Sequence, residues 1–287
     1  MKNFEYTAPA TLLEALEVLE EAREGWHVLS GGTNLVVEIR DRKKQPDVVV
    51  DISYIRDLRY IREDGGKIRL GALASVEDLL RSLLIREKAG PLWECAYNFA
   101  GPPIRNRATV AGNLVDASPA ADCVPPLQAL DAVATLRSPR GVRRVPVKDF
   151  CLGVRRTVRQ EDELVTEIEF EPLERNSGYG YYKLGRRNAM AISVVSEAVV
   201  LRMTDGICRK ASISLGAVAP TPIRVPEAEA LLEGRPLPGP ETVQECARLA
   251  SRAARPISDI RASAEYRTHM CEVLTRRLIQ RALGRQP

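Results

Sequence analysis

Two short glycine-containing segments carry the residue types best suited to holding an anionic ligand. They are residues 30–34 (SGGTN), which follow a short apolar run, and residues 109–113 (TVAGN). Glycine lets a backbone approach a ligand closely and adopt positive φ angles, so that successive N–H groups can converge on an anion. Threonine and asparagine side chains add further donors. If folding brings the two segments together, they suit a diphosphate held by backbone N–H groups rather than by a lysine.

Other chemistries find less support in the sequence. Each glycine segment taken alone could be an ordinary turn, and neither matches the G-x-G-x-x-G or G-x-x-x-x-G-K-[ST] patterns of nucleotide-binding loops. The six cysteines include no CxxC pair, and the two histidines, His27 and His269, have no motif partner. The sequence therefore indicates neither a transition-metal site nor a nucleophilic triad. The cysteines are expected to be reduced and mostly buried.

The composition is that of an ordinary globular protein. The chain has 287 residues, of which 45% are hydrophobic and 28% are charged. Because a typical domain has roughly 150 residues, two domains are expected. The net charge of +4 and the aromatic content of 5% do not match the clustered basic surface of a nucleic-acid binder. Glu5 precedes any apolar run, which argues against a signal peptide, and no stretch approaches a membrane span, so we expect a cytoplasmic chain.

The elements that must position the two segments follow from hydrophobic periodicity. A first helix is predicted at Thr11, whose spacing to Glu14 fits a capping box. A polar, glycine-bearing stretch at 172–180 indicates a domain boundary, and the strands and helices beyond it predict a layered α+β domain. The predicted helices cover 11–19, 75–84, 92–99, 119–130, 226–232, 241–254 and 263–282, an irregular stretch covers 101–113, and the predicted strands cover 26–29, 48–52, 67–72, 132–136, 143–147, 164–170, 191–203 and 210–218.

A family resemblance becomes visible around the second glycine segment. Residues 99–113 (FAGPPIRNRATVAGN) resemble the IRN-x-(G/A)-T-(I/V)-(G/A)-G-N segment of the FAD-binding subunit of molybdenum hydroxylases, a family that includes xanthine, nicotinate and carbon monoxide dehydrogenases. Further segments similar to this family follow in the same order at 117–122, 127–132, 182–189, 216–222 and 258–267. The likeness is colinear from Tyr6 to the last predicted helix and thus covers nearly the whole chain.

The resemblance implies an α+β fold with two domains. Residues 1–174 would form an FAD-binding domain of the vanillyl-alcohol oxidase class, built from two α/β subdomains that are split near residues 53–60. Residues 175–287 would form a smaller C-terminal flavoprotein domain made of a sheet and helices. The cofactor would be FAD, bound between the two subdomains.

The resemblance also implies which residues bind FAD. Two stretches would enclose the diphosphate, Phe99 and Asp122 would make an apolar and a polar contact, and Val165 (or Leu164) and Lys183 would lie beside the flavin ring. Judged without the resemblance, Phe99 could be a core residue, Asp122 a carboxylate in the first turn of a helix and Lys183 part of a solvated loop. No catalytic residue and no metal ligand is assigned. The implied cofactor-binding residues are Val28, Leu29, Ser30, Gly31, Gly32, Thr33, Asn34, Leu35, Phe99, Thr109, Val110, Ala111, Gly112, Asn113, Asp122, Val165 and Lys183.

Two positions depart from the family pattern. Asn34 stands where an aspartate is common, and Ala111 stands where a second glycine is usual. Both residues remain small or able to donate a hydrogen bond, so we expect altered detail rather than lost binding. The chain has no cysteine cluster, which argues against the benzoyl-coenzyme-A reductase branch with its additional iron–sulfur cluster.

The function implied by the resemblance is that of an electron-transferring flavoprotein subunit of an oxidoreductase. Its partners would be a large molybdenum-cofactor subunit, which oxidises the organic substrate, and a small subunit with [2Fe–2S] clusters. Electrons would leave through FAD to an external acceptor such as NAD, a quinone or oxygen. Two alternatives remain open: a free-standing FAD-dependent oxidase or dehydrogenase of a small alcohol or sugar nucleotide, and a scaffold of the same fold that has lost the flavin.

Overall fold

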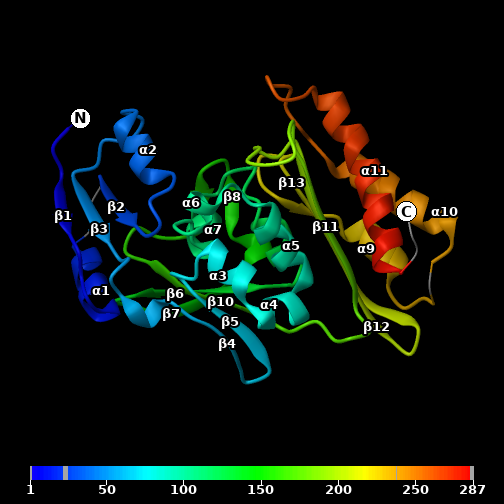
Figure 1. Cartoon of the computed structure of the whole chain (residues 1–287), viewed down its shortest axis with the longest axis horizontal. Helices are drawn as coiled ribbons and strands as arrows, with labels where there is room; N and C mark the ends of the chain where they lie inside the picture. Colours follow the sequence, from blue (N-terminus) through cyan, green and yellow to red (C-terminus); the bar gives the residue numbers. More distant parts are fainter. Residues whose placement is uncertain (1, 22–24, 237, 285–287) are drawn as a thin grey trace.

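A small parallel sheet begins the fold. The computed structural model describes residues 2–21, 25–236 and 238–284, and their arrangement is shown in Figure 1. Strands β1 (Glu5–Thr7) and β2 (Trp26–Leu29) both pair in parallel with the central strand β3 (Val48–Asp51). Every residue of β3 is buried, as expected for the centre of a parallel sheet. Helix α1 (Leu12–Glu20) connects β1 to β2, and α2 (Leu35–Arg40) lies between β2 and β3.

The second sheet is antiparallel and has five strands in the order β4-β5-β10-β6-β7. Its core strand β10 pairs with β5 on one side and with β6 on the other. The two-stranded pair β8 and β9 precedes β10 in the chain. The strands are β4 (Ile61–Asp64), β5 (Lys67–Gly71), β6 (Val133–Ser138), β7 (Gly141–Pro146), β8 (Cys151–Gly153), β9 (Arg156–Thr157) and β10 (Leu164–Phe170).

Most of the short helices lie in the chain between β5 and β6. Ser75 and Ser82 each accept a hydrogen bond from a backbone N–H three residues later, so each caps its own helix. The helices of this part of the chain are α3 (Val76–Arg81), α4 (Leu83–Lys88), α5 (Gly90–Asn98), α6 (Pro102–Arg105), α7 (Val110–Val115) and α8 (Val124–Ala129). The short 3-10 helix η1 (Arg56–Leu58) precedes β4, and η2 (Val147–Asp149) follows β7.

The third sheet is antiparallel and is covered on both faces (Figure 1). Helices α9 and α11 pack on one face, with α10 against them, whereas α5 and α8 contact the other. The side chains of β12 alternate accordingly: Val199 and Leu201 belong to the C-terminal core, and Ala198 and Val200 belong to the N-terminal core. The elements are β11 (Gly178–Leu184), β12 (Val195–Thr204), β13 (Ile207–Gly216), β14 (Ile223–Arg224), α9 (Pro226–Leu232), α10 (Pro240–Ala253) and α11 (Ala264–Ala282).

Several predicted boundaries differ from the structure. The helix predicted over 75–84 is two helices, because Ser82 ends α3 and caps α4. The helix predicted from 119 begins at Val124, and the irregular stretch 101–113 contains α6 and the start of α7. The strand predicted over 191–203 begins at Val195, after a loop.

The predicted domain limits fall between strands, and the split near 53–60 includes η1. Residues 174 and 175 lie between β10 and β11, and residues 53–60 lie between β3 and β4. These limits remain predictions. No helix within the described ranges is both long enough and apolar enough to cross a membrane.

Candidate functional site

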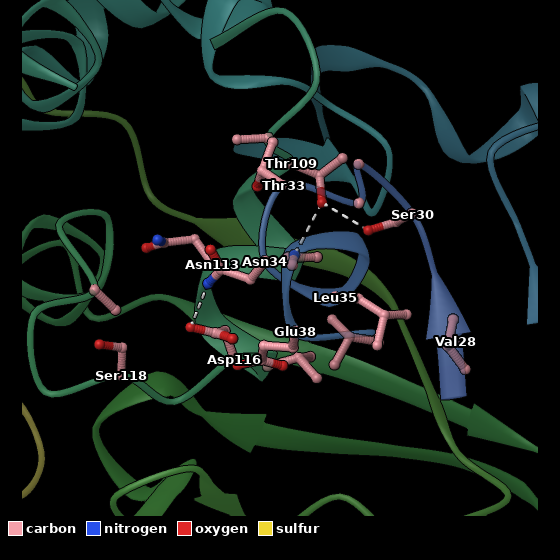
Figure 2. A pocket seen from close by; sticks show the side chains of 18 of the residues that line it. Val28, Ser30, Thr33, Asn34, Leu35, Glu38, Thr109, Asn113, Asp116 and Ser118 are labelled. Atoms are coloured by element: carbon pink, nitrogen blue, oxygen red, sulfur yellow. Dashed lines mark hydrogen bonds between the residues drawn. The ribbon is translucent and has the colours of Figure 1, made fainter. Parts of the chain in front are cut away.

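One large cavity lies where the glycine segments meet. Its volume is about 1010 Å³, and it is lined by residues from β2 and the loop after it, from α7, from the β8–β10 region and from β11. Pockets for small molecules and cofactors commonly measure about 300–1,000 Å³, so this cavity is large enough for a dinucleotide. Figure 2 shows side chains of the first and second glycine segments around it.

The first glycine segment starts where the parallel strand β2 ends. A Cβ atom added to Gly31 would lie 1.9 Å from the carbonyl oxygen of Arg107. Only glycine fits there, because the backbone just before the second segment already occupies the space. Gly32 follows with a φ of +74°, a conformation that side chains disfavour. The first segment is therefore packed directly against the backbone of Arg107 and Ala108, which leads into the second segment.

The second glycine segment is anchored by Thr109, which is the N-cap of α7. Its Oγ1 accepts a hydrogen bond from the N–H of Gly112 at 3.0 Å and lies 3.2 Å from Oγ of Ser30 in the first segment (Figure 2). The N–H of Val110 donates to the carbonyl of Ala74 at 3.0 Å. Both segments are thus held by specific contacts, although the N–H of Gly112 is already committed to Thr109.

A buried ion pair lies elsewhere in the cavity lining. Lys183 Nζ on β11 is 2.6 Å from Oδ2 of Asp122, and their side chains are 6% and 10% exposed. Ser193 Oγ donates to the other carboxylate oxygen of Asp122. The Lys183 ammonium lies 5.9 Å from the centre of the Phe99 ring. The predicted residues Asp122, Lys183 and Phe99 therefore meet, and Lys183 is a paired cation rather than a solvated one.

Asn113 connects this ion pair to the second glycine segment. Its Oδ1 accepts a hydrogen bond from the backbone N–H of Cys123 at 3.0 Å. The thiol of Cys95 donates to the carbonyl of Asp122. These bonds hold residues 122–123 in place just before α8. The helix starts later than predicted because a start at 119 would put Pro125 and Pro126 in its interior, whereas a start at Val124 leaves both in the first turn.

All of the predicted cofactor-binding residues except Leu29 and Val110 line the cavity. Leu29 and Val110 both lie in the described part of the chain. Leu29 is the last residue of β2, and Val110 is fully buried as the first residue of α7. That the lining residues contact FAD remains a prediction.

Sequence reasoning missed several residues that line the cavity. Asp116 lies between two segments that resemble the family, and Ile192 follows a third. Their positions beside these segments could have identified them as candidate lining residues. Arg155 and Arg159 near the β8–β9 turn belong to no motif. His27 also lines the cavity, and burial together with the nearby Lys44 lowers its pKa.

Among the described residues, neither a reactive thiol at Cys95 nor a metal site is supported. Burial and the neighbouring Cys123 raise the pKa of the Cys95 thiol well above its usual value, which makes it a poor nucleophile. Within the described residues, no three His, Cys, Asp or Glu side chains are grouped so that they could hold a metal ion.

The residues present fit a flavin dinucleotide. Gly31 leaves the first segment without a side chain where the segments touch, and the hydroxyls of Ser30 and Thr109 lie at the same point. The lining changes from small, donor-rich loops to the Phe99 ring beside the Lys183–Asp122 pair. A diphosphate needs the former, and a flavin ring suits an apolar surface with a few polar groups.

Comparison with known proteins also indicates an FAD-binding chain, over nearly its whole length. Residues 2–172 match the family described as "FAD binding domain in molybdopterin dehydrogenase", and residues 180–282 match "CO dehydrogenase flavoprotein C-terminal domain". The nicotinate dehydrogenase FAD-subunit of Eubacterium barkeri is 37% identical over 83% of this chain and 82% of that protein. The carbon monoxide dehydrogenase medium chain of Afipia carboxidovorans is 34% identical over 99% of this chain and 98% of its own length.

A solved structure agrees with these matches. Carbon monoxide dehydrogenase from Hydrogenophaga pseudoflava has a chain that superposes with a TM-score of 0.94 at 33% identity, covering 99% of both chains. The chain therefore belongs to the FAD-binding medium subunits of molybdenum hydroxylases, and it is an oxidoreductase flavoprotein subunit whose cofactor is FAD.

Proposed function

We propose that this chain holds FAD as an electron carrier between the [2Fe–2S] clusters of a small partner subunit and an external acceptor such as NAD, a quinone or oxygen. The organic substrate would be oxidised on a large partner subunit that carries the molybdenum cofactor. Bound FAD supplies the capacity to take up and release electrons, and the protein supplies position and electrostatics. The relatives named as FAD-subunit, medium chain and medium subunit support this division of labour.

The observation that carries the proposal is the single cavity in which both glycine segments and the Asp122–Lys183 pair meet. In the proposal, residues 30–34 and 109–113 hold the diphosphate. Lys183 is fixed beside the ring because Asp122 binds its ammonium and Ser193 in turn binds Asp122. The Phe99 side chain, which is 8% exposed, excludes water from one side of this pair.

The test is to purify the affinity-tagged chain from its own cells and to measure its visible spectrum and its molybdenum and iron contents. We expect a flavin spectrum, with one molybdenum-containing and one iron–sulfur-containing chain co-purifying. Anaerobic addition of the oxidisable substrate of the complex should bleach the flavin only when both partners are present.

The same experiment separates the alternatives. A flavin-containing chain that purifies alone and oxidises a small alcohol or sugar nucleotide would favour a free-standing enzyme. A colourless chain that does not take up added FAD would favour a scaffold. Either result contradicts the proposed electron-carrier role.

The location of the chain is part of the proposal. All six cysteines are described and free, and five of them are buried. Free cysteines are typical of a reducing compartment, which supports the expected cytoplasmic location. Fractionation of the native cells would test it.

A further inference from the structure

Four polar side chains form a connected cluster in one wall of the cavity. The Asp116 cluster consists of Asn34, Glu38, Asp116 and Arg155, all of which line the cavity. Nδ2 of Asn34 donates to Oδ2 of Asp116 at 2.8 Å, as Figure 2 shows. Nη1 of Arg155 donates to Oδ1 of the same carboxylate. Nη2 of Arg155 lies 3.5 Å from Oε1 of Glu38.

The Asp116 cluster is a closed ring that joins three segments of the chain. Asn34 is the N-cap of α2, and Glu38 lies one turn further along the same helix, so both face the same side. Asp116 is the C-cap of α7, three residues after the end of the second glycine segment. Arg155 lies in the turn between β8 and β9. Separating any two of these segments breaks at least one bond of the ring.

Local conformational preferences are overridden at two points of the ring. Asn34 occupies a helix N-cap but has helical rather than extended backbone angles, and within the described chain its Oδ1 makes no capping hydrogen bond, while its Nδ2 donates to Asp116. Arg155 has a φ of +59°, and its backbone N–H donates at 2.9 Å to the carbonyl of Ala117, which has a φ of +46°. Non-glycine residues keep such conformations only where surrounding contacts hold them.

We propose that Asp116 is a positioning residue for FAD. Asn34 ends the first glycine segment and Asp116 follows the second, so their bond holds the two halves of the FAD site at a fixed separation. Arg155 adds the β8–β9 turn to the same carboxylate. Opening of this ring sets the rate at which FAD leaves the cavity. The inference rests on the FAD site proposed above.

The bond also requires an amide at one end and a carboxylate at the other. A carboxylate at position 34 could not donate to Asp116, and two carboxylates at this distance would repel each other. If Asp116 were replaced by asparagine as well, the new amide at position 116 would donate to the new carboxylate at position 34, and the hydrogen bond would be restored with donor and acceptor exchanged. This reciprocity provides a test that a general loss of stability would not satisfy.

The experiment measures the rate of FAD release from the full-length, FAD-loaded chain, followed by the rise in flavin fluorescence after dilution. The variants are Asn34→Asp, Asp116→Asn and the double variant, with Asp57→Asn as a matched control at an exposed site of η1. Loss of a charge-assisted hydrogen bond corresponds to about a tenfold change, so Asn34→Asp should release FAD about tenfold faster. The double variant should release FAD more slowly than Asn34→Asp, and the control should match the wild type.

Thermal unfolding of the flavin-free proteins distinguishes positioning from folding. The proposal expects all four variants to unfold near the wild-type temperature without FAD. It is overturned if Asn34→Asp releases FAD at the wild-type rate, if the double variant is as fast as Asn34→Asp, or if the flavin-free Asn34→Asp protein is itself unfolded. A Gly112→Val variant separates failure of the proposed FAD site from failure of the proposed role of Asp116. If Gly112→Val retains FAD, the FAD site itself is wrong. If Gly112→Val loses FAD while Asn34→Asp releases FAD at the wild-type rate, only the role of Asp116 is wrong.

Discussion

At the scale of single residues, the positive charge of Lys183 is matched inside the cavity by the carboxylate of Asp122, which Ser193 also binds. The pair is nearly neutral as a unit, and both side chains are almost fully buried. Any effect of Lys183 on the flavin therefore depends on Asp122 as well. Removing either partner leaves the other as an uncompensated charge in a site where electrostatic interactions are strong.

We expect opposite changes in flavin midpoint potential from the two partners. Lys183→Ala leaves the negative charge of Asp122 beside the cofactor, which disfavours the addition of electrons and lowers the potential. Asp122→Asn leaves the positive charge of Lys183 and raises it. A change of roughly 1.4 kcal/mol in the interaction between this charge and the flavin corresponds to a shift of about 30 mV in the midpoint potential of a two-electron couple. Redox titration of the loaded proteins measures both shifts, with the exposed Lys148→Ala variant as control; shifts of the same sign would contradict this account.

The glycines of the site are not interchangeable. A Cβ atom at Gly31 would overlap the backbone of Arg107, so a substitution there forces the chain to move. A Cβ atom at Gly112 would lie 2.6 Å from Oγ1 of Thr109 and 3.2 Å from Oγ of Ser30, both of which are side-chain atoms. Gly112 is therefore the better position at which to disturb the cofactor without disturbing the fold.

Gly112→Val should abolish FAD retention while the chain remains folded, because the added side chain displaces the hydroxyls where the two segments meet. Flavin content from the visible spectrum and far-UV circular dichroism measure the two effects. Gly239→Val is the control, since a Cβ atom there meets no described atom within 4 Å. Full flavin content in the Gly112 variant would show that the diphosphate lies elsewhere.

At the scale of elements, β12 carries an ionisable side chain into the C-terminal core. Glu197 is fully buried, and neither of its carboxylate oxygens has a hydrogen-bond partner among the described residues. Burial raises the pKa of Glu197 well above its usual value of 4.5, although the nearby Thr275 opposes this shift. Glu197 thus keeps its proton in the folded chain at a pH at which the unfolded chain has released it.

This difference destabilises the fold as the pH rises. Above the unfolded pKa of about 4.5 the native state binds more protons than the unfolded state, so the free energy of unfolding falls by up to about 1.4 kcal/mol for each pH unit until the raised pKa of Glu197 is reached. Glu197→Gln should therefore be more stable than the wild type, and its advantage should be larger at pH 8 than at pH 5. Urea unfolding at both pH values measures it, and an advantage independent of pH would contradict the interpretation.

Much of the element order and of the site follows from sequence, and the exceptions have physical causes. The glycine segments were recognisable from their small residues, and the family resemblance pointed to Phe99, Asp122 and Lys183, which line the same cavity; their contact with FAD stays a prediction. The later start of α8 was predictable from Pro125 and Pro126, which fit only the first turn of a helix. Arg155 was missed because it belongs to no motif and its contact with Asp116 joins positions 39 residues apart. Asp116 itself could have been found from the two segments resembling the family on either side of it.

At the scale of the whole molecule, the predicted α+β fold and the FAD-subunit family are confirmed, and the two cores share a sheet. Tyr181, Ala198 and Val200 belong to the core of the N-terminal part, although they lie in β11 and β12. Val195, Val199 and Leu201 of β12 belong to the C-terminal core. The two parts of the chain therefore support each other through one layer of strands.

We expect the two parts to unfold together. Both tryptophans, Trp26 and Trp93, lie in the N-terminal part, so tryptophan fluorescence reports on that part alone, whereas far-UV circular dichroism also reports on α10 and α11. The two thermal transitions should coincide, and added FAD should raise both by the same amount, because a ligand that binds only the native state stabilises the whole cooperative unit. Two separate transitions, of which FAD shifts only one, would show that the parts are independent.

The ion pair between Asp122 and Lys183 joins positions 61 residues apart in the chain. A nascent polypeptide emerging from the ribosome exposes both glycine segments long before β11 has been synthesised. The cavity proposed to hold FAD is therefore completed late in translation, and we expect stable cofactor loading to wait until the third sheet has folded onto the rest of the chain.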